Sequence, residues 1–252
     1  MDPIVLSPAL RRRLAGPGPI VALTGAGVSA ESGLATFRGP GGLWEGHDPR
    51  DLATPEAFAR DPQLVWRFYA WRRACAAAAA PNPAHHALAA LAAARPDTGV
   101  VTQNVDGLHE RAGSPAVLRL HGSLWRLRCI EEERETEDLR LDLSPLPPRC
   151  PCGALLRPAV VWFGEALALE VLAAAQDAVR EAAVLLVAGT SSLVWPAAGL
   201  PALARAAGAW VVEINPEPTP LSEEADEILR LPAGRALPAL AAAAGAPLEA
   251  RA

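Results

Sequence analysis

Short runs rich in Val, Ile and Leu alternate along this chain with longer stretches rich in Ala and Leu. The short runs predict strands at residues 20–23, 99–102, 117–120, 184–188, 210–214 and 227–231. The longer stretches predict helices at residues 63–80, 84–94, 167–181 and 198–207. Apolar strands that alternate with helices of this length indicate βαβ units and a parallel sheet covered on both faces. The expected fold class is therefore α/β, with a Rossmann-like sheet domain.

Two regions interrupt the alternation. Residues 37–61 are rich in Gly and Pro, and residues 123–157 contain three of the four Cys, a charged run and four Pro. We expect both regions to be inserts that pack together as a smaller second domain. The sheet domain would comprise residues 1–38, 76–122 and 158–252, and the small domain residues 39–75 and 123–157.

Composition excludes several classes of protein. Apolar residues make up 51% of the chain, too many for a disordered or fibrous protein. The net charge of −5 argues against a nucleic-acid or anionic-membrane partner, because such binding needs a basic surface. Residues 182–204 lack charge, but their Gly and Pro residues favour a buried strand plus a loop over a membrane span. With four Cys and no secretory pattern at the N-terminus, we expect a soluble, cytoplasmic protein.

A glycine-rich turn follows the first predicted strand. The segment Gly25-Ala26-Gly27-Val28-Ser29-Ala30 fits the G-x-G-x-x-G/A pattern, in which absent side chains let the backbone approach a pyrophosphate. A tight turn without a ligand is the alternative. A dehydrogenase would carry an acidic residue at the end of a second strand about 20 positions further on, whereas residues 38–45 form a loop rich in Gly. The turn therefore favours dinucleotide binding but not hydride transfer.

Polar residues follow two further predicted strands. Gln103, Asn104 and Asp106 come directly after the second strand, at a carboxyl end where parallel sheets bind ligands. Alternatively, Asn104 and Asp106 form an Asx-turn that caps the next helix. His121 follows the third strand. A lone His at a strand end is often structural, but this one is the best candidate for a general base, because imidazole titrates near neutral pH.

These motifs occur together with others in the order found in one family. The chain resembles the sirtuins, the family of NAD-dependent protein-lysine deacylases. The matching segments are GAGVSAESG from Gly25, TFRG from Thr36, TQNVDGLH from Thr102, HG at His121, VVWFGE from Val160, GTSSLVWP from Gly189 and INPE from Ile214. The resemblance implies a Rossmann-like domain with a smaller inserted domain, which has a helical module and a zinc-ribbon-like module. It also implies acyl-lysine proteins or peptides as substrates, and a monomer as the usual form.

The resemblance implies a role for each matching position. The residues that would contact NAD are Gly25, Ala26, Gly27, Ala30, Thr36, Phe37, Arg38, Gln103, Asn104, Asp106, Gly189, Thr190, Ser191, Asn215, Glu217 and Ala233. Asn104, Asp106 and His121 would be catalytic, with His121 as the base. The residues that would pair with the substrate backbone as an added strand are Val161, Trp162, Phe163, Ser192, Leu193 and Val194.

In the reaction that the resemblance implies, the amide oxygen of the acyl-lysine attacks the ribose carbon of NAD as nicotinamide leaves. His121 accepts the proton of a ribose hydroxyl, and the products are free lysine, nicotinamide and O-acyl-ADP-ribose. Two other functions stay open for the same residues. One is NAD hydrolysis or ADP-ribosyl transfer, against which the peptide-pairing segments argue. The other is a non-catalytic sensor of NAD or ADP-ribose, against which His121 argues.

One predicted helix carries residues that would select the acyl group. Tyr69 and Arg72 lie three positions apart in residues 63–80, so they share one face and could hold a carboxylate. An amphipathic helix with Tyr69 half-buried and Arg72 in water is the alternative. Sirtuins that remove succinyl, malonyl or glutaryl groups carry Tyr-x-x-Arg and a small Ala upstream, here Ala53. The chain therefore resembles the desuccinylase and demalonylase class of sirtuin 5 and bacterial CobB, with weaker deacetylase activity.

Sirtuins usually hold a structural zinc ion with two Cys pairs in the small domain. Here Cys129 has Glu132 where its partner would stand, and the second pair is the tighter Cys150-Pro151-Cys152. A closed structural site needs four ligands, usually thiolate or imidazole. One interpretation is a site of three Cys completed by a glutamate from residues 131–133. The other is a decayed module held by packing alone. NAD is therefore the expected cofactor, and zinc stays open.

Overall fold

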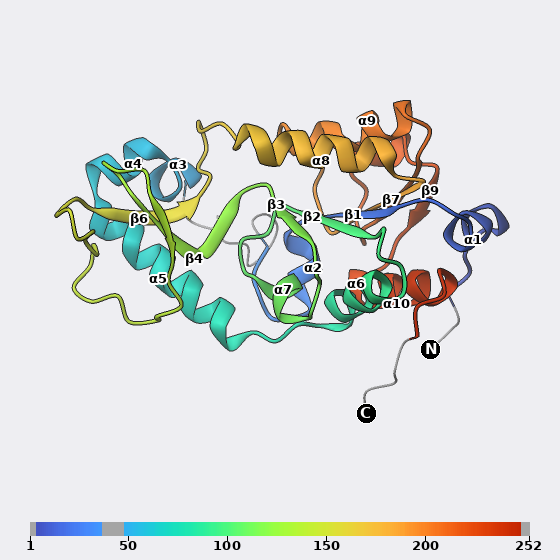
Figure 1. Ribbon diagram of the computed structural model, residues 1–252, viewed down its shortest axis with the longest axis horizontal. Coiled ribbons are helices and arrows are strands. Elements are labelled where there is room, and N and C mark those ends of the chain that lie inside the picture. The colour runs from blue at the N-terminus through green and yellow to red at the C-terminus, as the bar shows by residue number, and fades with distance from the viewer. Residues whose placement is uncertain (1–3, 37–47, 248–252) are drawn as a thin grey trace.

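The computed structural model describes residues 4–36 and 48–247, and its centre is a six-stranded parallel sheet (Figure 1). The strands lie in the order β3-β2-β1-β7-β8-β9. Their bounds are Val117–Arg119 (β3), Gly99–Thr102 (β2), Ile20–Thr24 (β1), Val184–Ala188 (β7), Trp210–Ile214 (β8) and Glu227–Leu229 (β9). All pairings between them are parallel. The predicted α/β fold is confirmed, although β3 and β9 are shorter than predicted.

Helices cover both faces of this sheet because its central strands are apolar on both faces. The covering helices are α1 (Pro8–Ala15), α6 (Pro83–Ala94), α10 (Ala233–Ala243), α8 (Leu169–Glu181) and α9 (Leu200–Ala206). In β1, Ile20 and Ala22 belong to the core shared with α1, α6 and α10. Val21 and Leu23 belong to the core shared with α8 and α9, as the two-residue period of a strand requires. Figure 1 shows α8 and α9 above the sheet and α6 and α10 below it.

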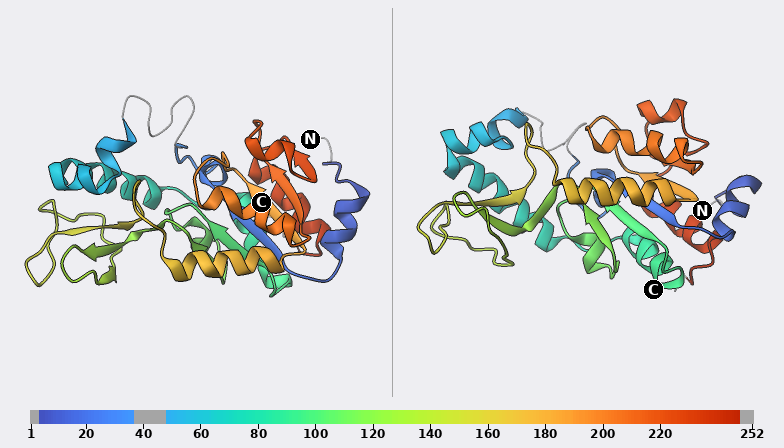
Figure 2. Two further views of the ribbon diagram at one scale, coloured as in Figure 1. Left: turned by 90° about the horizontal axis from the view of Figure 1, so that it is seen from above. Right: turned by 45° about the horizontal axis from the view of Figure 1, so that its top comes forward.

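The small domain combines three helices with a three-stranded antiparallel sheet. Its elements are α3 (Pro49–Leu52), α4 (Pro55–Arg60), α5 (Pro62–Ala78), β4 (Gly122–Cys129), β5 (Glu135–Glu137) and β6 (Leu156–Val160). Trp66 and Tyr69 of α5 share one core with Leu124 and Leu127 of β4. Both inserts therefore contribute to a single core, and Figure 2 shows this domain at one end of the sheet domain.

Polar residues followed by Pro set the start of several helices, α5 and α6 among them. Asp61 precedes Pro62 at the start of α5, and Asn82 precedes Pro83 at the start of α6. In both pairs the polar side chain accepts a backbone N–H of the first turn, while Pro occupies a position whose own N–H would lack a partner. These caps fix where the helices that carry Tyr69, Arg72 and His85 begin.

Several elements were not expected from the hydrophobic pattern. Strand β5 is exposed throughout, and a register shift between Gly122 and Leu127 interrupts β4. Helix α10 was not predicted, and Pro238 lies inside it, although proline usually breaks a helix. The remaining elements are the short helices α2 (Ala26–Ala30), α7 (Leu108–Arg111), η1 (Ala197–Gly199) and η2 (Pro220–Glu223). Among the described helices, none has both the length and the hydropathy that crossing a bilayer requires.

Candidate active site

The carboxyl ends of the parallel strands meet at a cavity of about 800 Å³. Residues that follow five different strands line it, as expected for the ligand-binding edge of such a sheet. These residues are Gly25 after β1, Gln103 after β2, His121 after β3, Gly189 after β7 and Asn215 after β8. The small domain supplies another part of the lining, which includes Ala53, Tyr69, Arg72 and Trp162.

Two glycine turns pack against each other at one end of this cavity. A Cβ atom on Gly27 would lie 2.7 Å from the Cα atom of Gly189, and one on Gly25 would lie 2.8 Å from the Gly189 oxygen. The Gly27 N–H donates to that same oxygen at 2.8 Å. Gly189 itself has a φ of 59°, a conformation that favours glycine. The turns thus present bare backbone to the cavity, a surface that suits a pyrophosphate.

The amides that follow β2 tie neighbouring strand ends together. Gln103 Nε2 donates to Thr190 Oγ1 at 2.9 Å, which joins the ends of β2 and β7. Asn104 is buried, and its Nδ2 donates to the Gly25 carbonyl oxygen at 3.0 Å. The side chain of Asn104 is therefore held against the glycine turn, and it does not cap the next helix.

Asp106 lies outside the lining of the large cavity. Its Oδ1 accepts the Leu108 N–H at 2.9 Å, so the capping interpretation is right for this residue. Asp106 lines a second cavity of about 140 Å³, which shares Arg72 and Asn104 with the first. Its Oδ2 accepts a hydrogen bond from Ser29 Oγ at 2.8 Å. Asp106 thus stabilises the turn before α7 and also lines the smaller cavity beside the large one.

A buried polar network beneath Asp106 was missed by the sequence analysis. His85 Nε2 lies 3.5 Å from Ser29 Oγ, and the rings of His85 and His109 are 4.8 Å apart. Burial, with a smaller contribution from His109, lowers the pKa of His85 to about 3. Burial also lowers the pKa of His109, whose Nε2 lies 2.9 Å from Thr24 Oγ1. Both rings are therefore neutral near pH 7. One feature of the sequence could have indicated that His85 is structural: it stands three residues after Asn82, at the position that completes a helix capping box.

His121 is held in the form that a general base needs. Its Nδ1 lies 3.1 Å from the Gln103 carbonyl oxygen, which can only accept a hydrogen bond. Nδ1 therefore carries the proton, and Nε2 is left with a lone pair. Burial lowers the pKa of His121, so the ring is neutral near pH 7. A neutral imidazole in the wall of the cavity can accept a proton from a bound ligand.

Tyr69 and Arg72 lie together at the small-domain side of the cavity. Tyr69 is 2% exposed, and its hydroxyl accepts a hydrogen bond from Trp162 Nε1 at 2.9 Å. The guanidinium of Arg72 lies 5.5 Å from the Tyr69 ring. Burial lowers the pKa of Arg72, while Tyr69 and Asp106 act in the opposite direction. The alternative is therefore wrong for Tyr69, which is buried, while Arg72 is half-buried in the cavity wall.

The segment expected to pair with a substrate backbone has its own amides occupied. The Val161 N–H donates to the His121 oxygen and the Phe163 N–H to the Ala53 oxygen, both at 3.0 Å. The Trp162 N–H donates to Glu165 Oε2 at 2.8 Å. This segment can therefore offer carbonyl acceptors to a bound peptide, but not these three N–H donors.

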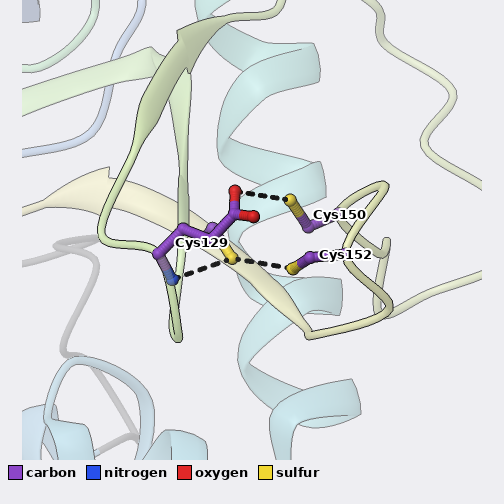
Figure 3. Close-up of side chains that lie close together, drawn as sticks. Cys129, Cys150 and Cys152 are labelled. Atoms are coloured by element: carbon purple, nitrogen blue, oxygen red, sulfur yellow. Dashed lines mark hydrogen bonds between the residues drawn. The ribbon is translucent and has the colours of Figure 1, made fainter.

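Three thiols and one carboxylate converge in the small domain (Figure 3). The ligand atoms of Cys129, Glu132, Cys150 and Cys152 all lie within 4.8 Å of one another. The Sγ atoms of Cys129 and Cys152 are 3.5 Å apart, and Cys150 Sγ is 3.8 Å from Glu132 Oε2. Thiolates bound tetrahedrally at about 2.3 Å from zinc are separated by roughly 3.8 Å. The four groups therefore fit a closed tetrahedral site.

The structure brings most of the predicted site residues to the large cavity. The predicted NAD contacts in its lining are Gly25, Ala26, Gly27, Ala30, Thr36, Gln103, Asn104, Gly189, Thr190, Ser191, Asn215, Glu217 and Ala233. The predicted substrate contacts in its lining are Ala53, Tyr69, Arg72, Val161, Trp162, Phe163, Leu193 and Val194. Ser192 is not part of the lining. Phe37 and Arg38 lie outside the described residues.

Comparison with known proteins places this architecture in one family. The family model of the Sir2 family matches residues 25–196. The "NAD-dependent protein deacylase 2" of Pyrobaculum aerophilum is 54% identical over 228 residues, which cover 90% of this chain and 91% of that protein. The "NAD-dependent protein deacylase 1" of Pseudomonas aeruginosa is 51% identical over 236 residues, which cover 90% and 94%.

Solved structures agree with these relatives. A crystal structure of a Sir2 homolog–NAD complex superposes with a TM-score of 0.90 at 47% identity, covering 95% of this chain and 94% of the other. A Sir2 H116A complex with a deacetylated p53 peptide and 3′-O-acetyl ADP ribose gives a TM-score of 0.84 at 31% identity, covering 92% and 96%. The chain belongs to the Sir2 family, the sirtuins, as its motifs predict.

Proposed function

We propose that this NAD-dependent protein deacylase removes acidic acyl groups from lysine side chains. The substrates would be succinyl-, malonyl- and glutaryl-lysine in proteins or peptides, with weaker activity on acetyl-lysine. The observation that carries the proposal is Arg72, a half-buried guanidinium in the walls of both cavities and beside Tyr69. The planar fork of a guanidinium can donate two parallel hydrogen bonds to a substrate carboxylate, a charge-assisted contact that a neutral acetyl group cannot make.

Tyr69 and Ala53 complete this acyl end. The Tyr69 oxygen accepts a hydrogen bond from Trp162, so its own O–H can be donated to a carboxylate. Burial raises the pKa of the Tyr69 hydroxyl, which keeps it protonated. Ala53 is buried in the cavity wall and leaves room that a larger side chain would fill. Together these groups would recognise a carboxylate through two donors, one of them charged.

The glycine turns would hold the NAD pyrophosphate, and the residues after β7 and β8 would hold the adenosine half. When bound, NAD supplies a ribose carbon that the acyl oxygen attacks as nicotinamide leaves. Asn104, fixed against Gly25, and Asp106, fixed by Ser29, would orient the nicotinamide ribose. His121 would accept a ribose hydroxyl proton at Nε2, since its Nδ1 proton is held by the Gln103 carbonyl.

We also propose that Cys129, Glu132, Cys150 and Cys152 hold a structural zinc ion. All four ligand atoms lie close enough for a tetrahedral site, and the Arg134 guanidinium lies 3.7 Å from Cys150 Sγ and 3.3 Å from Glu132 Oε2. Three thiolates and a carboxylate carry more negative charge than one zinc ion neutralises, and Arg134 would compensate part of the excess. The ion would close the end of the small domain and take no part in the reaction.

Nicotinamide release from NAD tests the main proposal with peptides that differ only in the acyl group: succinyl, malonyl, glutaryl, acetyl and none. We expect the acidic acyl peptides to give the highest kcat/KM and the unmodified peptide to give no release. Release without an acyl group would instead favour NAD hydrolysis, and a higher kcat/KM for acetyl would refute the acidic preference. That the protein is a cytoplasmic monomer without a nucleic-acid partner stays a prediction from the sequence.

A further inference from the structure

Trp195 is the most exposed tryptophan among the described residues. Trp195 is 76% exposed, Leu193 53% and Phe163 44%, and all three line the large cavity. Tryptophan is mostly buried in folded proteins, because it removes more apolar surface from water than other side chains do. An indole left in water at the rim of a binding cavity therefore suggests contact with a ligand.

The indole is seated on a fixed part of the backbone. A Cβ atom on Gly199 would lie 2.7 Å from Trp195 Cζ3 and 3.3 Å from Cη2, so the six-membered ring packs directly against this glycine. The Gly199 N–H donates to the Pro196 oxygen at 3.0 Å, and Ala197 beside it is buried. Gly199 has ordinary right-handed backbone angles, so the space for the ring, and not the backbone conformation, calls for glycine here.

The charges of the cavity wall indicate what would lie on the exposed part of the ring. Glu31 and Glu217 line the cavity without a described ion pair, and the charge of a third lining carboxylate, Glu165, is balanced by Arg157. Among the described lining residues, Arg72 is the single guanidinium. Tryptophan is the side chain that attracts cations best, through the negative face of its ring. No described ring or guanidinium stacks on Trp195. An exposed indole at a cavity whose wall also carries carboxylates without a described ion pair suits a positively charged side chain.

We propose that Trp195 is a specificity-determining residue that stacks on an arginine side chain flanking the acyl-lysine. The inference rests on the proposed function, because it assumes that an acyl-lysine peptide occupies the cavity. Trp195 directly follows Val194, the end of the segment expected to pair with that peptide. Since alternate residues of a strand point to opposite faces, arginine should matter at one flanking position, or at two positions separated by one residue, and not at all positions.

The test uses peptides with one acyl-lysine and either arginine, alanine or phenylalanine at each flanking position in turn. With the wild-type protein, arginine at the preferred position should lower KM about two- to fivefold relative to alanine, as expected for an exposed cation–π contact. In Trp195→Ala the two KM values should become equal. In Gly199→Ala the indole is still present but displaced, so the preference should also be lost.

Leu169→Ala serves as the control, because Leu169 is equally apolar and 81% exposed but lies on α8, outside the cavity lining. It should keep the full arginine preference. Equal KM values for arginine and alanine peptides in the wild type would overturn the proposal, as would a preference for phenylalanine or an arginine preference that survives Trp195→Ala. The ratio can be measured with whichever acyl group is turned over, so a failure of the acidic-acyl proposal appears separately in the acyl panel.

Discussion

The two ends of the large cavity are built from different parts of the chain. At the cofactor end, Gly25, Gly27 and Gly189 present backbone, and any side chain there would collide with the opposite turn. At the acyl end, Tyr69, Arg72 and Trp162 present polar side chains from the small domain. If the proposed assignment holds, cofactor recognition depends on absent side chains in a rigid sheet, whereas acyl recognition depends on the identity of a few side chains. Substitutions in the glycine turns should therefore almost always impair cofactor binding, whereas substitutions at the acyl end should readily alter which acyl group is preferred.

The largest expected effect is on His121, the proposed general base. Replacing it by Ala should lower kcat about 10²- to 10⁴-fold for succinyl and acetyl peptides alike, the usual contribution of a general base. NAD binding, measured by calorimetry, should stay close to wild type. Because burial lowers the pKa of His121 and the base must be neutral, the acid limb of the wild-type kcat/KM profile should lie below pH 6.5. Turnover within a fewfold of wild type would remove His121 from the mechanism.

Arg72→Met should lower activity on acidic acyl peptides and leave the cofactor end of the cavity unchanged. Loss of a charge-assisted contact with the substrate costs about 2–4 kcal/mol, which corresponds to roughly a 30- to 1000-fold lower kcat/KM for succinyl peptides. Activity on acetyl peptides should change little or rise, since a neutral acetyl group makes no charge-assisted contact with Arg72. Arg67→Met is the matched control, because Arg67 lies on the same helix but is exposed and outside both cavities. Equal losses for succinyl and acetyl peptides would refute the acyl-end assignment.

Gly27→Ala should affect the cofactor end alone. The new Cβ atom would lie 2.7 Å from the backbone of Gly189, so one of the two turns must shift at a cost of roughly 1–2 kcal/mol. We expect KM for NAD to rise about five- to thirtyfold, with the ratio of succinyl to acetyl activity unchanged. Gly99→Ala is the control, because a Cβ atom there would meet no atom within 4 Å. An altered acyl ratio in Gly27→Ala would show that the two ends are coupled.

The same contrast explains what could be predicted from the sequence. Short motifs at strand ends, such as Gly25-Ala26-Gly27, act through local backbone shape, so one segment predicts the tight turn, and the family order of several motifs then indicates the ligand. The continuous apolar runs of β1 and β7 likewise predicted the parallel sheet, because both faces of these strands are buried. The residues near Asp106 predicted both a helix cap and a ligand contact, and the sequence could not decide between them. In the structure one carboxylate oxygen of Asp106 accepts the Leu108 N–H, and the other accepts the Ser29 hydroxyl.

Contacts between distant segments could not be predicted in this way. The hydrogen bond between Trp162 and Tyr69 joins residues 93 positions apart, and nothing in either segment encodes it. The choice among three consecutive glutamates as a partner of the Cys residues depended on a tight turn after β4, where Glu133 has a φ of 54°. That turn places the carboxylate of Glu132 beside Cys150, which approaches from another loop. Long-range packing, and not local pattern, decides both.

The smallest expected effect on turnover belongs to the site of Glu132. With zinc bound, the wild-type protein should hold about one ion per chain by metal analysis. Glu132→Ala should lose zinc to a chelator at a concentration at which the wild type keeps it, and Glu132→Cys should hold it more tightly, since thiolate is the preferred ligand. Glu133→Ala is the control, because Glu133 lies outside the cluster and pairs with Arg128.

Loss of zinc should raise KM for the acyl peptide more than KM for NAD. Leu127 of β4, two residues before Cys129, packs in the same core as Trp66 and Tyr69 of α5. Loosening this strand would therefore raise KM for the acyl peptide by a fewfold, while KM for NAD stays unchanged because the glycine turns belong to the other domain. A larger change for NAD than for the peptide would contradict this division of the cavity. Wild-type protein purified without chelator and free of zinc would instead support a decayed module held by packing.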